Sequence, residues 1–95
     1  MRHTDVKPWV MDDVTQALKS HNPLFRHVLG RILFDLHYHL PANLALYQPK
    51  RIPGRPGCFW YERIYLNDRT LQHFSFVVRD TNPGILEVIW VIPTA

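Results

Sequence analysis

The first half of the chain carries the periodicity of amphipathic helices. Apolar residues recur at three- and four-residue spacings over residues 14–18, behind two aspartates at 12–13 that suit a helix N-terminus. A stronger pattern, a broad apolar stripe, runs over residues 24–40. The Asn-Pro dipeptide at 22–23 is a typical helix start, and Pro41 predicts the end because a proline disfavours helical backbone at the preceding residue.

The second half carries the composition of β-strands. Aromatic and β-branched residues dominate residues 58–66, 71–79 and 85–92. Turn-forming sequences separate these segments at 67–69 and 80–84, and short turns between consecutive strands produce an antiparallel meander. The predicted fold is therefore a two-layer α+β domain, in which N-terminal helices pack on a three-stranded antiparallel β-meander.

Alternation along the strands predicts which side of the sheet faces the helices. A five-residue turn at 80–84 pairs Arg79 with Ile85 and places apolar residues opposite one another on a single face. The resulting pairs are Val78 with Leu86, Phe76 with Val88, and Phe74 with Trp90. This face is coherent enough to form the core beneath the long helix.

The first strand completes both faces of the predicted sheet. Trp60, Ile64 and Leu66 are expected on the core face, where Glu62 is a charged misfit. The opposite face then mixes aromatic, apolar and charged side chains, a composition typical of an interface. Its members are Phe59, Tyr61, Arg63, Tyr65, His73, Ser75, Val77, Arg79, Ile85, Glu87, Ile89 and Val91.

A connection rich in proline and glycine, residues 41–57, joins the two halves. The chain has a formal net charge of +3, and Lys50, Arg51 and Arg55 match this excess in a stretch without acidic residues. Such a basic loop is often simply solvated, but it also suits contact with a phosphate backbone. The mild overall charge permits an anionic partner and does not require one.

Length and cysteine content limit the class of protein. The 95 residues form a single domain, 1–95, with a helical part at about 11–40 and the meander at about 58–92. The single cysteine, Cys58, excludes a disulfide framework and a CxxC zinc site within this chain. No apolar run reaches the roughly 20 residues of a membrane span, and no signal-like segment is present, so a cytoplasmic protein without membrane association is expected.

Histidine and cysteine positions do not predict a metal or cofactor site. His37 and His39 are two positions apart on the long helix, so their side chains diverge by about 200°. Cys58 would need a base to act as a nucleophile, and its expected position at the start of a strand, facing the core, argues against that role. We therefore expect neither a metal nor a cofactor.

Side chains that can carry chemistry gather on the mixed face. A histidine or glutamate can move a proton, and an arginine can stabilise a charged phosphate. The catalytic candidates are Arg63, His73, Arg79 and Glu87. The candidates for binding phosphates and bases are Lys50, Arg51, Arg55, Tyr61 and Tyr65. The candidates for a protein interface are Phe59, Tyr61, Ile89 and Val91 on the sheet, with Phe34 and Tyr38 on the long helix.

The order of these elements resembles the RelE/ParE superfamily of small bacterial toxins. The likeness covers about residues 24–92 and rests on Gly-Arg-Pro-Gly at 54–57, followed by a strand with Arg63 and by two further strands. The resemblance implies an action on RNA, the ribosome or gyrase, with an antitoxin protein as partner. Arg63 and Arg79 are the arginines that match the family's pattern.

Two features depart from that family. Its members usually open with a strand, whereas residues 5–10, which include Pro8, do not read as one. Its nuclease members often place a histidine or tyrosine near the C-terminus, where this chain has residues 91–95 without either. These departures put nuclease activity in doubt more than antitoxin binding.

Three functional hypotheses follow from these observations. The first is a toxin-like protein acting on RNA, the ribosome or gyrase. The second is a non-enzymatic homodimer, held through the mixed face or through the helix side that bears Phe34 and Tyr38. The third is a small-ligand pocket between the sheet and the basic loop, lined by Trp60 or Trp90.

Overall fold

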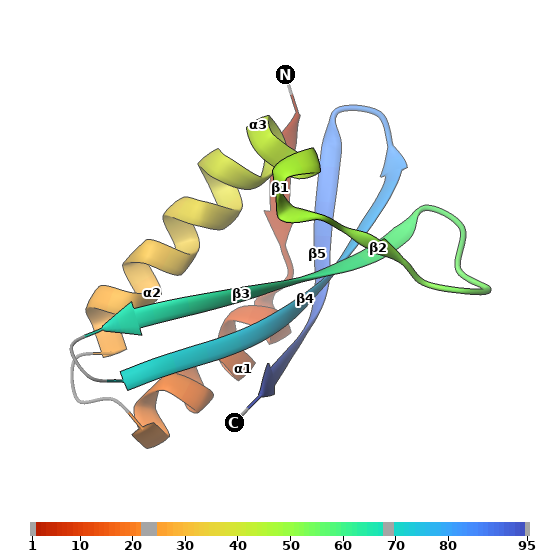
Figure 1. Ribbon diagram of the computed structural model, residues 1–95. Coiled ribbons are helices and arrows are strands. Elements are labelled where there is room, and N and C mark those ends of the chain that lie inside the picture. The colour runs from red at the N-terminus through yellow and green to blue at the C-terminus, as the bar shows by residue number, and fades with distance from the viewer. Residues whose placement is uncertain (1, 22–24, 68–69, 95) are drawn as a thin grey trace.

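The chain folds into a five-stranded mixed sheet with its helices packed on one face (Figure 1). The computed structural model describes residues 2–21, 25–67 and 70–94. The strand order is β1-β5-β4-β3-β2; β1 runs parallel to β5, and the other neighbours are antiparallel. The strands are β1 (His3–Val6), β2 (Lys50–Arg51), β3 (Cys58–Asn67), β4 (Thr70–Asn82) and β5 (Ile85–Thr94). The α+β prediction is confirmed, but the sheet has five strands where three were predicted.

The apolar stripes of both predicted helices point into the core. Helix α1 (Pro8–His21) begins earlier than predicted at residues 12–13, with a proline at its first position, where its missing N–H is not needed. The fully buried apolar residues of the helical part are Val10, Val14, Leu18, Val28, Ile32, Leu36 and Leu40. Within each helical stretch they follow one another at four-residue spacings, as residues on one face of a helix do.

The long helix predicted over residues 24–40 changes character midway and continues past Pro41. Its pieces are α2 (Phe25–Phe34), the π-helical turn η1 (Asp35–His39), α3 (Leu40–Asn43) and the 3-10 turn η2 (Leu44–Tyr47). In η1 the Leu40 N–H bonds to the Asp35 carbonyl, five residues back. We infer that this wider turn makes room for the Pro41 ring, which clashes with a preceding carbonyl in a regular α-helix. The predicted start at 22–23 lies outside the described residues.

A short strand, β1, opens the fold where the sequence did not predict one. It pairs with β5, with His3 beside Ile85 and Val6 beside Val88. The backbone N–H of Lys7 continues the pairing by donating to the Val88 carbonyl at 3.1 Å. Four residues are too few for alternation to be visible in a sequence, and this strand exists because β5 offers it an edge.

The predicted inner face of β4 is confirmed, but the face assigned to β3 is wrong. Phe74, Phe76 and Val78 are fully buried against the helices. Tyr61 and Tyr65 join them, at 1% and 4% exposure, and Phe59 packs on the same cluster. Residues expected in the core, Trp60, Ile64 and Leu66, lie on the opposite face together with Glu62. Both faces of β3 are rich in apolar side chains, so hydrophobicity alone could not choose between them.

Strand β5 is displaced from the predicted register and changes faces partway along. Its inner residues are Leu86 and Val88, as predicted, and then Val91 in place of Trp90. The observed inner pairs are Val78 with Val88, Phe76 with Val91, and Phe74 with Pro93. Register irregularities between Val77 and Val78 and between Arg79 and Asn82 account for the difference, because each extra residue reverses the alternation.

Candidate functional site

The sheet face turned away from the helices, here called the outer face, is apolar and is not covered by any described helix. Large apolar side chains on it are strongly exposed: Ile64, Leu66, Leu71, Trp90 and Ile92, at 42–67%. A face of this kind on a small domain usually marks a binding surface. The uncovered face expected from the sequence is therefore present, but with different residues from β3.

Two tryptophans stand on either side of one valine on the outer face. Val77 pairs with Trp60 on β3 and with Trp90 on β5, so the three residues form a row across the sheet. A hollow of about 540 Å³ lies over this row, lined also by Ile52, Pro53 and Arg55 from the loop after β2. Strand spacing separates the two tryptophan backbones by about 9.5 Å. A planar ring at van der Waals contact with an indole on each side needs about 7 Å, so we call this hollow the tryptophan notch.

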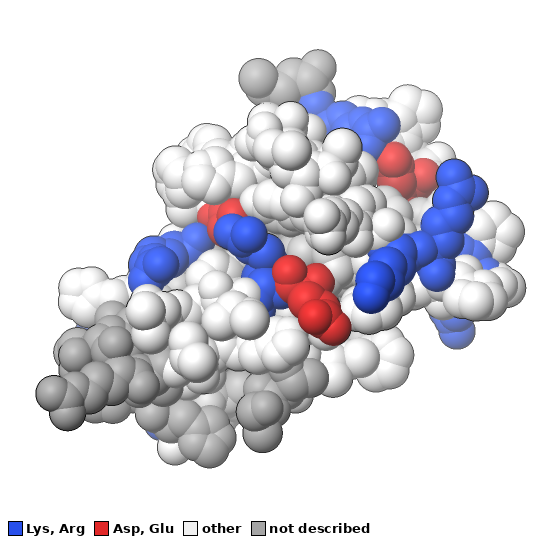
Figure 2. Space-filling view, viewed as in Figure 1, with Lys and Arg blue, Asp and Glu red and all other residues white. Residues whose placement is uncertain are grey.

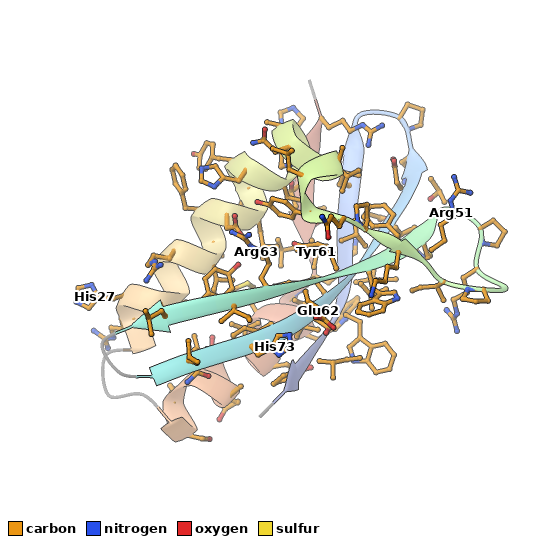
Figure 3. The ribbon with its side chains drawn as sticks, viewed as in Figure 1. His27, Arg51, Tyr61, Glu62, Arg63 and His73 are labelled. Carbon is orange, nitrogen blue, oxygen red and sulfur yellow. The ribbon has the colours of Figure 1, made fainter. Side chains whose placement is uncertain are left out.

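The basic loop forms one wall of the tryptophan notch. Lys50 lies with its Nζ 4.9 Å from the centroid of the Trp60 ring, a cation–π contact. Arg55 is exposed and lines the notch, whereas Arg51 pairs with Phe59 of the inner face and lines a separate hollow, so only Lys50 and Arg55 of the three predicted basic residues border this end of the outer face. In Figure 2, lysine and arginine side chains gather where β2 and its loop lie in Figure 1, and Figure 3 marks Arg51 among them.

Backbone bonds and glycines hold the loop in place. The Ile52 N–H donates to the Cys58 carbonyl at 3.2 Å, and the Asp80 N–H donates to the Gly57 carbonyl at 2.7 Å. Gly57 adopts a φ of 77°, and a Cβ there would lie 2.6 Å from the Cγ2 of Thr81. Only glycine fits this close approach, so the loop has a defined conformation beside the tryptophan notch.

The catalytic candidate His73 lies on the outer face, where it pairs across the sheet with Ile64 and its side chain is close to that of Glu62. Its Nε2 is 3.5 Å from the Oε2 of Glu62, on the neighbouring strand (Figure 3). Glu62 was the misfit of the predicted core, and in the structure it lies on the exposed side of β3, while Arg63 takes the inner side and pairs with Asp35. Ser75 lies between Glu62 and Ile92 in the next row, so this acid–imidazole pair borders the tryptophan notch.

Arg79 and Glu87 also lie on the outer face, as predicted, but they pair with each other six residues along β4 from His73. Arg79 donates from Nε to Glu87 at 2.6 Å, and Lys7 lies 3.5 Å from the same carboxylate. The bond from Arg79 is the main cause that lowers the pKa of Glu87, with its positive charge adding to the effect. Arg63 is on the inner face. The four residues predicted as one catalytic group therefore occupy three separate places.

The structure reveals a buried polar cluster that sequence reasoning missed. Asp35, which is 4% exposed, accepts bonds from the hydroxyls of Tyr47 at 2.6 Å and Tyr65 at 2.7 Å. The Nε and Nη2 of Arg63 donate to the same carboxylate at 3.1 and 3.3 Å. The π turn places Asp35 here, and an acid within an otherwise apolar stripe was the available signal. Each oxygen of the Asp35 carboxylate thus accepts two hydrogen bonds, so the cluster stabilises the join between helix and sheet.

Burial and this carboxylate explain the ionisation of the tyrosines around it. Burial raises the pKa of Tyr65 and of Tyr47, and hydrogen bonding to Asp35 raises both further. Burial also raises the pKa of Tyr61. Tyr61 and Tyr65, predicted to bind bases, therefore have no exposed ring to offer, and they work as core residues.

The predicted interface residues divide in the same way. Tyr61 and Val91 are buried in the core and Phe59 packs against it, so those three do not present an accessible surface. Ile89 is partly exposed in the wall of the tryptophan notch. Phe34 and Tyr38 are exposed at 53% and 66%, with ring centroids 4.9 Å apart, on the helix side.

The chain has no match among the known proteins with which it was compared. No protein-family model, no curated protein and no solved structure matches it. Within residues 2–21, 25–67 and 70–94, no helix has the length and apolar character to cross a membrane. The same residues contain no group of three or more potential metal ligands placed to hold an ion.

Proposed function

We propose that this protein binds single-stranded RNA on its outer face, an RNA-directed role of the kind that its resemblance to RelE/ParE toxins implies. In this proposal a base enters the tryptophan notch and stacks on Trp60 and Trp90, while Lys50 and Arg55 contact the neighbouring phosphates. The row formed by Trp60, Val77 and Trp90 is the observation that carries the proposal.

The chemistry of the notch favours RNA over an uncharged ligand. Stacking of a base on an aromatic side chain contributes about 1–3 kcal/mol and tolerates any base, because every base has a π-face. The adjoining stretch from Lys50 to Gly57 has three cations and no acid, which suits a chain of phosphates. A small aromatic molecule would use the tryptophans but would gain little from the basic wall.

The test is a titration of end-labelled single-stranded RNA, followed by fluorescence anisotropy. Trp90→Ala is expected to weaken binding by about 5- to 150-fold, the equivalent of one lost stacking contact. Tyr38→Ala removes another exposed aromatic ring, on the helix side, and is the matched control that should leave affinity unchanged. Equal affinity of Trp90→Ala and the native protein would overturn the proposal.

Expression in cells tests the toxin character of the same proposal. Strong expression of the native chain is expected to arrest growth, and the double change Trp60→Ala with Trp90→Ala is expected to restore it. Unaffected growth with abundant native protein would refute a toxin role while leaving RNA binding to be judged by the titration.

A second candidate, self-association, is favoured by one further observation. Ile64, Leu66 and Leu71 form an exposed apolar strip at the end of the outer face away from β2, at 62%, 55% and 67% exposure. Two copies could bury these strips against one another. Light scattering should then report a dimer that Leu71→Asp converts to a monomer, whereas a monomeric native protein would exclude this candidate. A substitution at Tyr61, another predicted interface residue, cannot test self-association, because that side chain is buried in the core.

A further inference from the structure

A second basic hollow lies between α2 and β3 and is separate from the tryptophan notch beside the basic loop. It has a volume of about 520 Å³, and we call it the α2–β3 groove. Its charged lining consists of Arg26, Arg31, Arg63 and Asp35, so three guanidinium groups face one carboxylate. His27 and His39 line it as well and add no negative charge. An excess of positive charge in a hollow attracts an anion.

Two of the arginines are held in place before any ligand arrives. Arg63 is bound through two nitrogens by Asp35, and its guanidinium lies 4.8 Å from the centroid of the Tyr47 ring. Arg31 reaches across the groove and donates from Nη1 to the Leu66 carbonyl at 2.6 Å. Burial lowers the pKa of Arg63, but Asp35 and Tyr65 raise it by more, so this side chain stays charged. Side chains fixed in this way lose little entropy when an anion binds.

The groove is continuous with the outer face at Ile64. This residue lines the groove, and its side chain belongs to the outer face, four residues along β3 from Trp60. The distance between those two positions is about 13 Å at the rise of a β-strand. Surfaces that bind single strands contact several nucleotides, so one strand can span the notch and the groove. In Figure 3, Arg63 and His27, which both line the groove, lie toward the end of β3 away from Arg51.

We infer that the α2–β3 groove binds a second phosphate group of the RNA strand whose base occupies the tryptophan notch. This inference rests on the proposed function and extends it, because it assigns a phosphodiester ligand to a groove that the sequence did not predict. The guanidinium groups of Arg31 and Arg63 are the anion's main partners, since a planar guanidinium offers paired N–H donors to phosphate oxygens. Arg26 adds charge at the rim.

The test compares two lengths of oligonucleotide over a range of salt concentrations. A dinucleotide fills the notch alone, whereas an octanucleotide reaches the groove. For the octanucleotide, Arg31→Gln is expected to reduce the slope of log affinity against log salt by about 0.7, the value for one phosphate contact to a single strand. The dinucleotide slope should stay the same. Arg31→Lys keeps the charge and should retain most of the slope, and Arg26→Gln provides a second variant at a residue on the rim.

The outcomes separate this inference from the proposed function. Tight dinucleotide binding with an octanucleotide slope that neither Arg31→Gln nor Arg26→Gln changes would overturn the groove and leave the notch standing. Failure of both oligonucleotides to bind the native protein would overturn both. A reduced slope for the octanucleotide alone supports both. Circular dichroism of each variant establishes that the fold is retained before its binding is interpreted.

Discussion

The two faces of the sheet use similar side chains for opposite purposes. On β3, Tyr61 is 1% exposed beneath the helices, whereas its neighbour Trp60 stands in the wall of an open hollow. On the inner face, aromatic rings pack on one another, and the buried carboxylate of Asp35 accepts hydrogen bonds from the hydroxyls of Tyr47 and Tyr65. Outside, two tryptophans face solvent across a valine, with cations beside them. Burial makes the inner face the source of stability and leaves the outer face exposed to solvent.

The largest predicted effect comes from the inner polar cluster. Asp35→Ala leaves Arg63 without its carboxylate and the hydroxyls of Tyr47 and Tyr65 without their acceptor. We expect a loss of about 3 kcal/mol in the free energy of unfolding, the lower end for a broken buried ion pair because Arg63 keeps some contact with water. Urea denaturation measures it. Asp80→Ala breaks an exposed ion pair with Arg2 and should cost at most about 1 kcal/mol. Equal losses of stability in Asp35→Ala and Asp80→Ala would contradict the greater importance of the buried cluster.

Neighbouring residues on β5 provide the sharpest comparison of the two faces. Val91 is 2% exposed and Trp90 is 57% exposed, because the strand changes faces between Val88 and Val91. Val91→Ala should lower the free energy of unfolding by about 2 kcal/mol, whereas Trp90→Ala should change it by less than about 0.5 kcal/mol despite removing the larger side chain. Thermal unfolding of the two variants tests this. A greater loss for Trp90→Ala would mean that the register is wrong.

Alkaline pH is expected to act on the inner face. The ordinary tyrosine pKa is 10.0, and Tyr47, Tyr61 and Tyr65 all have raised values, so the folded state keeps protons that the unfolded chain releases. Stability is therefore complete below pH 10 and falls as the pH rises above it. Tyrosinate absorbance and circular dichroism should change together, because these rings ionise on unfolding. Ionisation of all tyrosines well before the loss of structure would contradict the burial.

Acid pH is expected to act through Glu87. Its pKa lies below the ordinary 4.5, because Arg79 donates to it, so its contribution to stability is present above pH 4.5 and is lost as the pH falls through the lowered value. The thermal midpoint should drop over that range, and Glu87→Gln should drop less because it has no charge to lose. The same acid dependence in Glu87→Gln and the native protein would assign the effect to other carboxylates.

The smallest predicted effect is at Glu62 on the outer face. This carboxylate lies on the path between the notch and the groove and repels a passing phosphate, so Glu62→Gln should tighten RNA binding. At about 7 Å in water the repulsion is about 0.6 kcal/mol, a gain of about threefold. The RNA titration measures it, with stability unchanged because the side chain is exposed. Weaker binding would indicate that Glu62 contacts the RNA through hydrogen bonds.

Elements with one-sided patterns were predicted correctly, and elements with two-sided patterns were not. The α1 stripe and the inner face of β4 have apolar residues on one side, and both predictions are confirmed. On β3, rings occupy both sides and each side carries one charged residue, Glu62 outside and Arg63 inside, so the composition of the strand did not distinguish them. The basic loop could be located from composition, but its position beside Trp60 depends on the pairing of Lys50 with that residue.

The sequence by itself determined an α+β domain, the inner face of its central strand and a cluster of three cations in one loop. Only the tertiary structure decided which side of β3 is buried, where β5 changes faces and that β1 completes the sheet. The reason is physical: periodicity records how many apolar side chains a segment must bury, while partners across the fold decide which ones. A tyrosine can be buried here because Asp35, thirty residues away from Tyr65, accepts its hydrogen bond. A tryptophan is left outside, where it lines the surface that we propose binds RNA.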